Sequence, residues 1–156
     1  MELPAPREPG SYHLALVCLG NICRSPMAHV VLDDLVADLP VTVSSAGTGD
    51  WHVGEPMDAR AAATLTAAGL DPSAHRANQI ATVEGYDVVL AMDDANLGDL
   101  GGRSERVLMF RDFDPSGPGE VPDPWFGGQD GFDVVLDMVA RTSKQLASQL
   151  EELLAR

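Results

Sequence analysis

The sequence predicts an α/β fold in which a mostly parallel sheet is covered by helices on both faces. Short apolar segments with β-compatible residues alternate along the chain with segments of helical periodicity. The 156 residues, of which 45% are hydrophobic and 22% charged, correspond to about one folded domain. Strands separated by helices favour a parallel sheet, whose ligand site is expected at the carboxyl ends of the strands.

Four segments are predicted strands: residues 12–19, 41–47, 86–92 and 106–110. The first predicted helix follows Ser25 and Pro26, which suit an N-cap and a first helical turn, and its apolar face is formed by Val30, Val31, Leu35 and Leu39. The second is capped by Asp58 and closed by Gly69. A short helical stretch separates the last two strands. One or two amphipathic helices follow over residues 132–153.

Residues 1–10 contain three Pro and one Gly, so we expect a flexible leader that joins no core, followed by a single domain over residues 11–156. The leader lacks the apolar stretch of a signal peptide, and no apolar run has membrane-spanning length. Two cysteines, Cys18 and Cys23, are too few for a disulfide framework and indicate thiols in a reducing compartment. We therefore expect a cytoplasmic protein without a membrane partner.

The net charge of −14, from 24 acidic and 10 basic residues, would repel a polyphosphate backbone, so nucleic acid is not an expected partner. Residues 114–128 hold four Pro and four Gly, which is incompatible with regular structure. A long loop in a small domain is often functional.

Residues 18–25 (CLGNICRS) combine a thiol and a guanidinium between a predicted buried strand and a helix N-terminus. Backbone N–H groups of the Gly20-Asn21 turn can point inward, and the helix dipole adds positive potential, so the segment can form an anion-binding cradle. The Arg24 fork can bind two oxygens of a phosphate. The same field favours the thiolate of Cys18, a nucleophile at neutral pH. The predicted phosphate-binding loop comprises Leu19, Gly20, Asn21, Ile22, Cys23 and Ser25.

The main alternative is that Cys18 is a small buried hydrophobe, the usual state of a lone cysteine. A buried Arg24 needs an anion, however, and Gly20-Asn21 supplies the backbone freedom that a cradle requires, which favours the functional interpretation. A Walker loop is disfavoured because GxxxxGK[ST] is absent. Zinc is disfavoured because the Cys18/Cys23 pair lacks two further ligands at usable spacing. We expect neither a metal nor a cofactor.

The segment VCLGNICRSP (residues 17–26) closely resembles the phosphate-binding loop of the low-molecular-weight protein tyrosine phosphatases, C-x5-R-S at the end of the first strand. Further similar segments follow in the family's order: residues 44–48 with Trp51, residues 75–79, Met92-Asp93 with Asn96, and residues 123–125. The resemblance implies a three-layer sandwich, a four-stranded parallel sheet with helices on both faces. It also implies hydrolysis of phosphotyrosine in proteins.

By this resemblance Cys18 attacks phosphorus, Arg24 and the loop amides hold the equatorial oxygens, and Asp123 protonates the leaving phenolate. A cysteinyl-phosphate forms and water then hydrolyses it with Asp123 acting as base, so a thiolate and a carboxylic acid must coexist at the start. Tyrosine-phosphorylated proteins are the implied partners, and a cognate tyrosine kinase is a further candidate.

Other roles follow from the same resemblance. Ser45 and His75 map onto a polar network that holds Asn21, a residue that tolerates left-handed geometry. Ser25 is expected both to cap the helix and to donate its hydroxyl to the Cys18 sulfur. The chain departs from the family at Asn78, where Arg is usual, which puts the contact made by that Arg in doubt.

Aromatic residues are expected to wall the cleft. Trp51 and Trp125 lie among turn residues at positions that flank the cleft mouth in the family, where they would stack on a phenyl ring. Such walls make the cleft deep and favour phosphotyrosine over the shorter phosphoserine. Phe126 follows Trp125 where many members carry a tyrosine pair, so regulation by phosphorylation there is excluded.

Cys23 is either a packed thiol or a redox partner of Cys18. We favour the second role, in which oxidised Cys18 condenses with Cys23 to a disulfide and so escapes overoxidation.

Three rival functions remain. A thioredoxin-coupled arsenate reductase shares the cradle but needs relay thiols, and no Cys follows Cys23. A non-catalytic phosphate or phosphotyrosine reader would need neither thiolate nor acid, and a redox sensor leaves Arg24 unexplained. Arginine phosphate is a lesser alternative substrate, which the aromatic walls disfavour.

Overall fold

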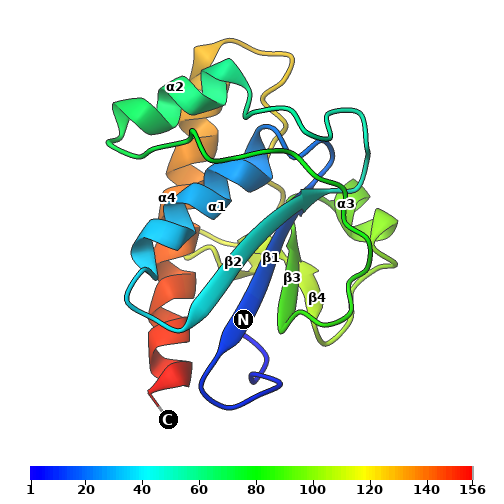
Figure 1. The fold of residues 1–156 in the computed structure, drawn as a ribbon, viewed down its shortest axis with the longest axis vertical. Helices are drawn as coiled ribbons and strands as arrows, with labels where there is room; N and C mark the ends of the chain where they lie inside the picture. Colours follow the sequence, from blue (N-terminus) through cyan, green and yellow to red (C-terminus); the bar gives the residue numbers. More distant parts are fainter. Residues whose placement is uncertain (156) are drawn as a thin grey trace.

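Four parallel strands form the centre of the molecule in the order β2-β1-β3-β4 (Figure 1). The computed structural model describes residues 1–155. The strands are β1 (Tyr12–Cys18), β2 (Val41–Gly47), β3 (Val88–Ala91) and β4 (Val107–Met109). Cys18 pairs with Gly47 at the ends of β1 and β2, so the predicted nucleophile lies at the carboxyl edge of the sheet, as expected from the sequence.

The central strands β1 and β3 are almost entirely buried, as expected for parallel strands covered on both faces. Side chains of β1 alternate between two apolar clusters. Leu14 and Leu16 belong to the larger cluster, which includes α1 and α4, whereas Ala15 and Val17 belong to a smaller cluster on the opposite face.

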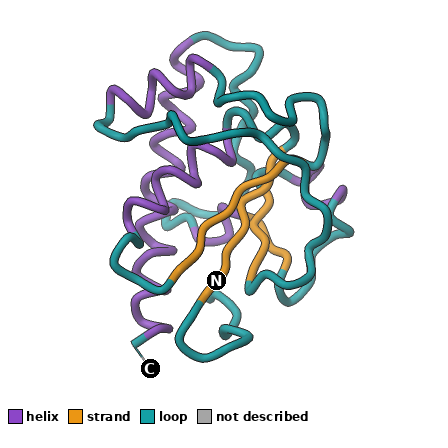
Figure 2. Tube along the Cα trace, in the orientation of Figure 1, coloured by secondary structure: helices purple, strands orange, loops and turns teal. Residues whose placement is uncertain are grey.

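Helices cover both faces of the sheet, which confirms the predicted three-layer α/β architecture (Figure 2). The larger cluster lies under α1, α2 and α4. On the other face the smaller cluster lies under the short α3 and the loop before β3. The helices are α1 (Arg24–Leu35), α2 (Ala59–Ala67), α3 (Asp94–Asp99) and α4 (Gln129–Leu154), with a 3-10 turn η1 (Phe110–Phe113).

The start of α1 differs from the prediction. Its N-cap is Cys23, which makes no side-chain capping bond, and Ser25 lies inside the first turn, so the expected cap role of Ser25 is wrong. The predicted apolar face is confirmed in part. Val31 is buried in the main core, and Val30 and Leu39 pack against it. Leu35 is 40% exposed, so its placement on this face is wrong, and Leu32 and Val36 are buried instead.

The other helix predictions agree with the structure. The Asp58 side chain accepts hydrogen bonds from the backbone N–H groups of Arg60 and Ala61 and caps α2. Gly69 adopts a φ of 84° just past the helix end. Residues 114–128 contain no helix or strand, and the C-terminal periodicity corresponds to one helix, α4.

The leader is packed against the domain, so the expectation that it joins no core is wrong. Leu3 is 6% exposed and belongs to the main core, and its N–H donates to Gln149 Oε1 at 2.8 Å. The Tyr12 hydroxyl donates to the Pro4 carbonyl at 2.9 Å, and the Arg7 N–H donates to Asp87 Oδ1 at 2.7 Å. These contacts fasten the leader to α4 and to the amino-terminal edge of the sheet.

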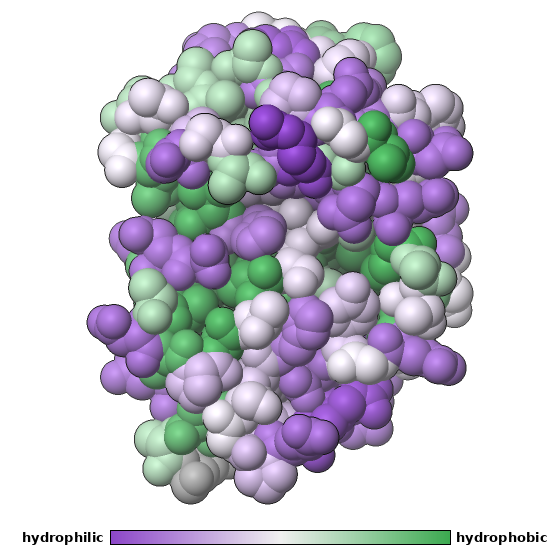
Figure 3. All heavy atoms as spheres, viewed as in Figure 1, coloured by the Kyte–Doolittle hydropathy of each residue, from purple (hydrophilic) through white to green (hydrophobic). Residues whose placement is uncertain are grey.

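Hydrophilic residues cover most of the face shown in Figure 3, with hydrophobic side chains gathered in smaller patches. Within residues 1–155, no helix is both long and apolar enough to span a bilayer.

Candidate active site

The loop between β1 and α1 is held in a tight curve against the end of β2. Asn21 has a φ of 56°, in the left-handed region that Asn tolerates better than most residues. The N–H groups of Thr48 and Gly49 donate to the carbonyls of Cys18 and Leu19, each at 2.9 Å. A Cβ at Gly47 would lie 2.7 Å from the Leu19 carbonyl oxygen, so glycine is required there for this close approach.

Cys18 ends β1 with its sulfur hydrogen-bonded by two groups. Ser25 Oγ lies 3.0 Å from the sulfur, and the Asn21 N–H donates to it at 3.3 Å. Ser25 Oγ accepts a bond from Asn21 Nδ2 at 2.8 Å, so its single proton is left for the sulfur or for the Ala46 carbonyl, which lies at the longer distance of 3.5 Å. Both bonds would stabilise a negative charge on Cys18. The predicted Ser25–Cys18 contact is therefore present.

Arg24 begins α1 and is 3% exposed. Its Nη1 lies 2.7 Å from Asp93 Oδ2 and donates to the Val121 carbonyl at 3.0 Å. Burial acts to lower the Arg24 pKa, but the negative charges of Cys18 and Asp93 outweigh it, so the pKa is raised and the guanidinium stays charged.

The anion that a buried Arg24 requires is thus supplied in part by Asp93, a residue to which the sequence analysis gave no role. Asp93 also caps the short helix α3, accepting from the Asn96 N–H at 2.8 Å. An Asp at the carboxyl end of a predicted strand was the signal that could have identified it.

A polar network behind the loop holds Asn21 in place. His75 Nε2 donates to the Asn21 carbonyl at 2.6 Å, and Asn21 Nδ2 donates to Ser45 Oγ at 3.1 Å. Asn78, the departure from the family, donates its backbone N–H to Asn21 Oδ1 at 3.0 Å and its side chain to the Ser45 carbonyl at 2.8 Å. Burial lowers the pKa of His75, which favours the neutral ring in this network.

His29 joins the same network and was also missed. Its Nδ1 lies 3.1 Å from Ser45 Oγ, and burial lowers its pKa.

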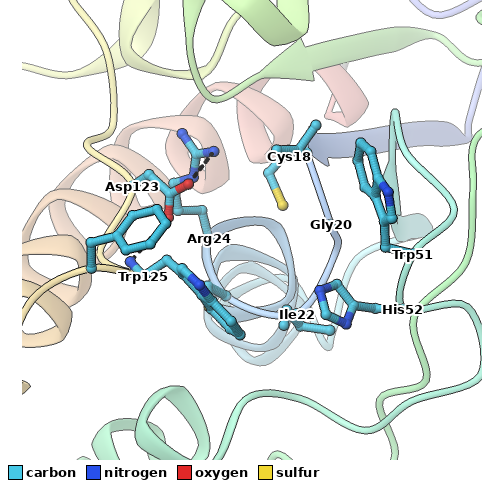
Figure 4. Close-up of a pocket in the computed structure, with 11 residues that line it drawn as sticks. Cys18, Gly20, Ile22, Arg24, Trp51, His52, Asp123 and Trp125 are labelled. Carbon is cyan, nitrogen blue, oxygen red and sulfur yellow. Dashed lines mark hydrogen bonds and ion pairs between the residues drawn. The ribbon is translucent and has the colours of Figure 1, made fainter.

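A cavity of about 240 Å³ opens above the sulfur of Cys18 (Figure 4). Trp51 and Trp125 lie on different sides of it with the Cys18 sulfur between them, and Arg24 lies beside Asp123 on the side away from Trp51. Its lining comprises Cys18, Leu19, Gly20, Ile22, Cys23, Arg24, Trp51, His52, Asp123, Trp125 and Phe126. All three aromatic residues predicted to wall the cleft therefore reach it.

Phe126 and His52 also line the cavity. Phe126 is 95% exposed, so its ring is free to contact a partner. His52, which the sequence analysis missed, lies 5.9 Å from the Trp125 ring centroid and 2.6 Å from a carboxylate oxygen of Glu55. Its position directly after Trp51 is the signal that could have pointed to it.

Asp123 reaches the cavity from the loop of residues 114–128. Its Oδ1 accepts the Trp125 N–H at 3.1 Å, and its Oδ2 lies 3.8 Å from Arg24 Nη2. The side chain is 46% exposed. The carboxyl group is thus close to the guanidinium and open to an incoming molecule.

Cys23 is buried on the same loop, and both cysteines are free thiols. Burial raises the pKa of Cys23 to about 12, with the negative charges of Asp58 and Cys18 adding to the effect. Cys23 therefore rests as a neutral thiol near neutral pH.

Fold and site together define an α/β protein with a thiol at the base of a cavity that is also lined by a buried guanidinium and a carboxyl group. A sequence profile of the family described as low molecular weight phosphotyrosine protein phosphatase matches residues 13–155. The chain belongs to this family and is a phosphoric monoester hydrolase.

Individual relatives agree. A low molecular weight protein-tyrosine-phosphatase of Streptomyces coelicolor is 40% identical over 157 residues, covering 91% of this chain and 95% of that protein. A protein tyrosine phosphatase structure from Entamoeba histolytica has a TM-score of 0.84 at 30% identity, covering 91% of this chain and 98% of that one. A structure of the YwlE arginine phosphatase has a TM-score of 0.80 at 26% identity and covers 90% of this chain and 96% of that one. YwlE is a protein of Bacillus subtilis.

Proposed function

We propose that the protein hydrolyses phosphotyrosine in proteins through a cysteinyl-phosphate on Cys18, with Arg24 and Asp123 as its other catalytic residues. The observation that carries this proposal is the hydrogen-bonded Cys18 sulfur at the base of a cavity lined by Arg24, Asp123 and aromatic rings. Nucleophile, charge-stabilising group and acid lie around one space.

In the first step the Cys18 thiolate attacks phosphorus while the bond from phosphorus to the tyrosine oxygen breaks. Loop N–H groups and Arg24 Nη2, the nitrogen not engaged by Asp93, hold the equatorial oxygens. Asp123 gives its proton to the leaving phenolate. In the second step Asp123, now a carboxylate, takes a proton from water as that water attacks phosphorus. The sulfur–phosphorus bond breaks and inorganic phosphate leaves.

The cavity walls support an aromatic phosphoester as substrate. Trp51 and Trp125 offer apolar ring faces to a phenyl group, and Ile22 adds apolar surface beside the sulfur. Arginine phosphate, which the likeness to the YwlE arginine phosphatase suggests, is the lesser alternative substrate. Tyrosine-phosphorylated proteins are the proposed partners, together with a cognate tyrosine kinase. Nucleic acid is not a proposed partner, and the proposed location is the cytoplasm.

Oxidation of Cys18 would inactivate the enzyme reversibly. Peroxide oxidises the Cys18 thiolate to sulfenic acid. The Cys23 sulfur then attacks it, forming the disulfide and releasing water. The Cys18 charge helps to keep Cys23 protonated, so loss of that charge on oxidation favours the step.

Peroxide treatment should lower the intact mass of the protein by two hydrogens, and dithiothreitol should restore activity. A Cys23→Ser variant should instead be inactivated irreversibly.

Activity on aryl phosphates in the presence of a chelator tests the main proposal. The rate should follow a bell-shaped pH profile and be abolished by Cys18→Ser. Asp123→Ala should lower kcat/KM by about a hundredfold for phosphotyrosine but far less for dinitrophenyl phosphate, whose leaving group needs no proton. Activity that requires added metal would refute the mechanism.

A further inference from the structure

Arg60 lies where helix α2 meets the loop that carries Asp123. We infer that Arg60 is a positioning residue for Asp123, which acts on the reaction by fixing the acid loop above the cradle. The inference rests on the proposed role of Asp123 as general acid. Arg60 is not among the residues that line the cavity, so any effect it has must pass through a neighbour.

Arg60 binds the acid loop through backbone carbonyls just beyond Asp123. Its Nη1 donates to the Trp125 carbonyl at 3.2 Å and to the Gly127 carbonyl at 3.4 Å. The Trp125 N–H in turn donates to Asp123 Oδ1. Trp125 is therefore held at its carbonyl by Arg60 and holds the acid by its amide, a path of two hydrogen bonds from guanidinium to carboxylate.

The other side of the guanidinium is anchored to the start of α2. Its Nε and Nη2 each lie 3.2 Å from one of the two Asp58 carboxylate oxygens, so the fork is engaged in a bidentate pair. The Asp58 N–H donates to the Ile22 carbonyl at 2.9 Å. Asp58 thereby ties Arg60 to the phosphate-binding loop itself.

Aromatic rings complete the clamp. The guanidinium carbon lies 5.4 Å from the Trp125 ring centroid and 4.7 Å from that of Phe132 at the start of α4. Every nitrogen of Arg60 thus has a partner in Asp58 or in the backbone of the Asp123 loop. Its charge serves to join the acid loop, α2 and the cradle.

The contacts of Arg60 with Asp58, Trp125, Gly127 and Phe132, here called the Arg60 clamp, fix a loop that has no regular structure of its own. Residues 114–128 have no helix or strand to fix Asp123, and the Asp123 side chain is half exposed. A general acid must stay within hydrogen-bond reach of the leaving oxygen, and small displacements strongly reduce its contribution.

The test compares leaving groups. For Arg60→Ala we expect kcat/KM for a phosphotyrosine peptide to fall by roughly tenfold, while that for dinitrophenyl phosphate stays within about twofold of wild type. Inhibition by inorganic phosphate should be unchanged because the cradle is intact. Arg60→Lys keeps the charge but loses the planar guanidinium, so its kcat/KM for the peptide should lie between those of wild type and Arg60→Ala. Arg103→Ala, which removes an ion pair at 2.6 Å between the half-exposed Arg103 and the carboxylate of Asp112, is the matched control, and its kcat/KM for both substrates should equal that of wild type.

A double-mutant cycle separates positioning from a general structural effect. On an Asp123→Ala background, Arg60→Ala should cause no further loss with the phosphotyrosine peptide. Two results would overturn the inference. One is a double variant whose loss of kcat/KM equals the product of the losses in the two single variants. The other is an Arg60→Ala variant that loses kcat/KM equally for both leaving groups. If Asp123→Ala itself lacks leaving-group dependence, the acid role proposed for Asp123 fails instead. If Asp123→Ala shows it and Arg60→Ala does not, only the clamp is wrong.

Discussion

At the residue scale, Asn21 combines backbone strain with hydrogen bonding. Its φ of 56° places it in a region that glycine enters freely and alanine does not. Its side chain donates to Ser25 and Ser45 and accepts from Asn78, so the same residue shapes the cradle and holds the Ser25 hydroxyl that contacts Cys18.

Substitution of Asn21 separates these two contributions. Asn21→Gly keeps the backbone geometry and loses the side-chain bonds, whereas Asn21→Ala loses both. We expect both variants to lower kcat/KM, and Asn21→Ala to unfold with about 1 kcal/mol less stability than Asn21→Gly. Urea denaturation and steady-state kinetics measure the two effects. Equal stability of the two variants would show that the cradle does not depend on left-handed geometry at residue 21.

At the scale of elements, Asp114 ties the end of η1 to the long helix α4. Its side chain is buried and accepts hydrogen bonds from Arg111 and Arg141, at 2.8 Å from each Nε, and from the Ser116 N–H at 2.9 Å. Burial opposes ionisation of Asp114, but the bonds from Arg141, Ser116 and Arg111 outweigh it and lower its pKa to about 2. The acid loop begins at this residue, so the tie fixes its starting point.

The lowered pKa of Asp114 predicts a pH-dependent contribution to stability. Because the folded pKa lies below the unfolded value of 3.8, the contribution is present above pH 4 and is lost as the pH falls toward 2. Asp114→Asn should therefore lower the free energy of unfolding by about 2 kcal/mol at pH 7. In urea denaturation, the difference in free energy of unfolding between wild type and Asp114→Asn should become smaller below pH 4. A difference that is constant across this range would contradict the ionic origin of the effect.

At the scale of the whole molecule, the leader is a strap that lies outside the region matched by the family profile, residues 13–155. Leu3 inserts into the main core beside α4, while Arg106 donates to the Ala5 carbonyl at 2.9 Å. The strap closes the end of the sheet opposite the cradle, so it should support stability without touching catalysis.

Leu3→Ala tests this role. Removal of a buried leucine side chain should reduce the free energy of unfolding by about 2 to 3 kcal/mol and leave kcat/KM unchanged. Leu35→Ala is the matched control, because Leu35 is 40% exposed and its removal should change stability by less than about 0.5 kcal/mol. Thermal unfolding of both variants decides the point. If the two variants unfold alike, the leader does not contribute to the core.

Local rules explain which features were predictable from sequence. Cys18 at a strand end, Asp58 as a helix cap and Asn21 in a left-handed turn each depend on neighbours within a few residues, and the structure agrees with all three. The partners of Arg24 and Asp123 were not predictable in this way. Asp93 lies 69 residues from Arg24 in the sequence. Arg60 lies 65 residues from Trp125, which connects it to Asp123. Spacing along the sequence does not indicate that residues so far apart form pairs.

The errors have the same origin. Leu3 is a single apolar residue among prolines, so no periodicity marks it as buried, yet α4 brings Gln149 to its amide. Ser25 follows the rule for caps, but the Cys18 sulfur and the Asn21 amide engage its hydroxyl. A local preference was overridden in each case by contacts that only the folded chain provides.

Trapping the covalent intermediate tests the central claim most directly. Asp123→Ala, mixed with a dinitrophenyl phosphate and quenched during turnover, should carry one phosphoryl group, and peptide mass spectrometry should locate it on Cys18. The Cys18→Ser variant treated identically should carry no phosphoryl group on Cys23. A protein that turns over substrate while remaining unmodified, or one that is modified on a residue other than Cys18, would contradict the account.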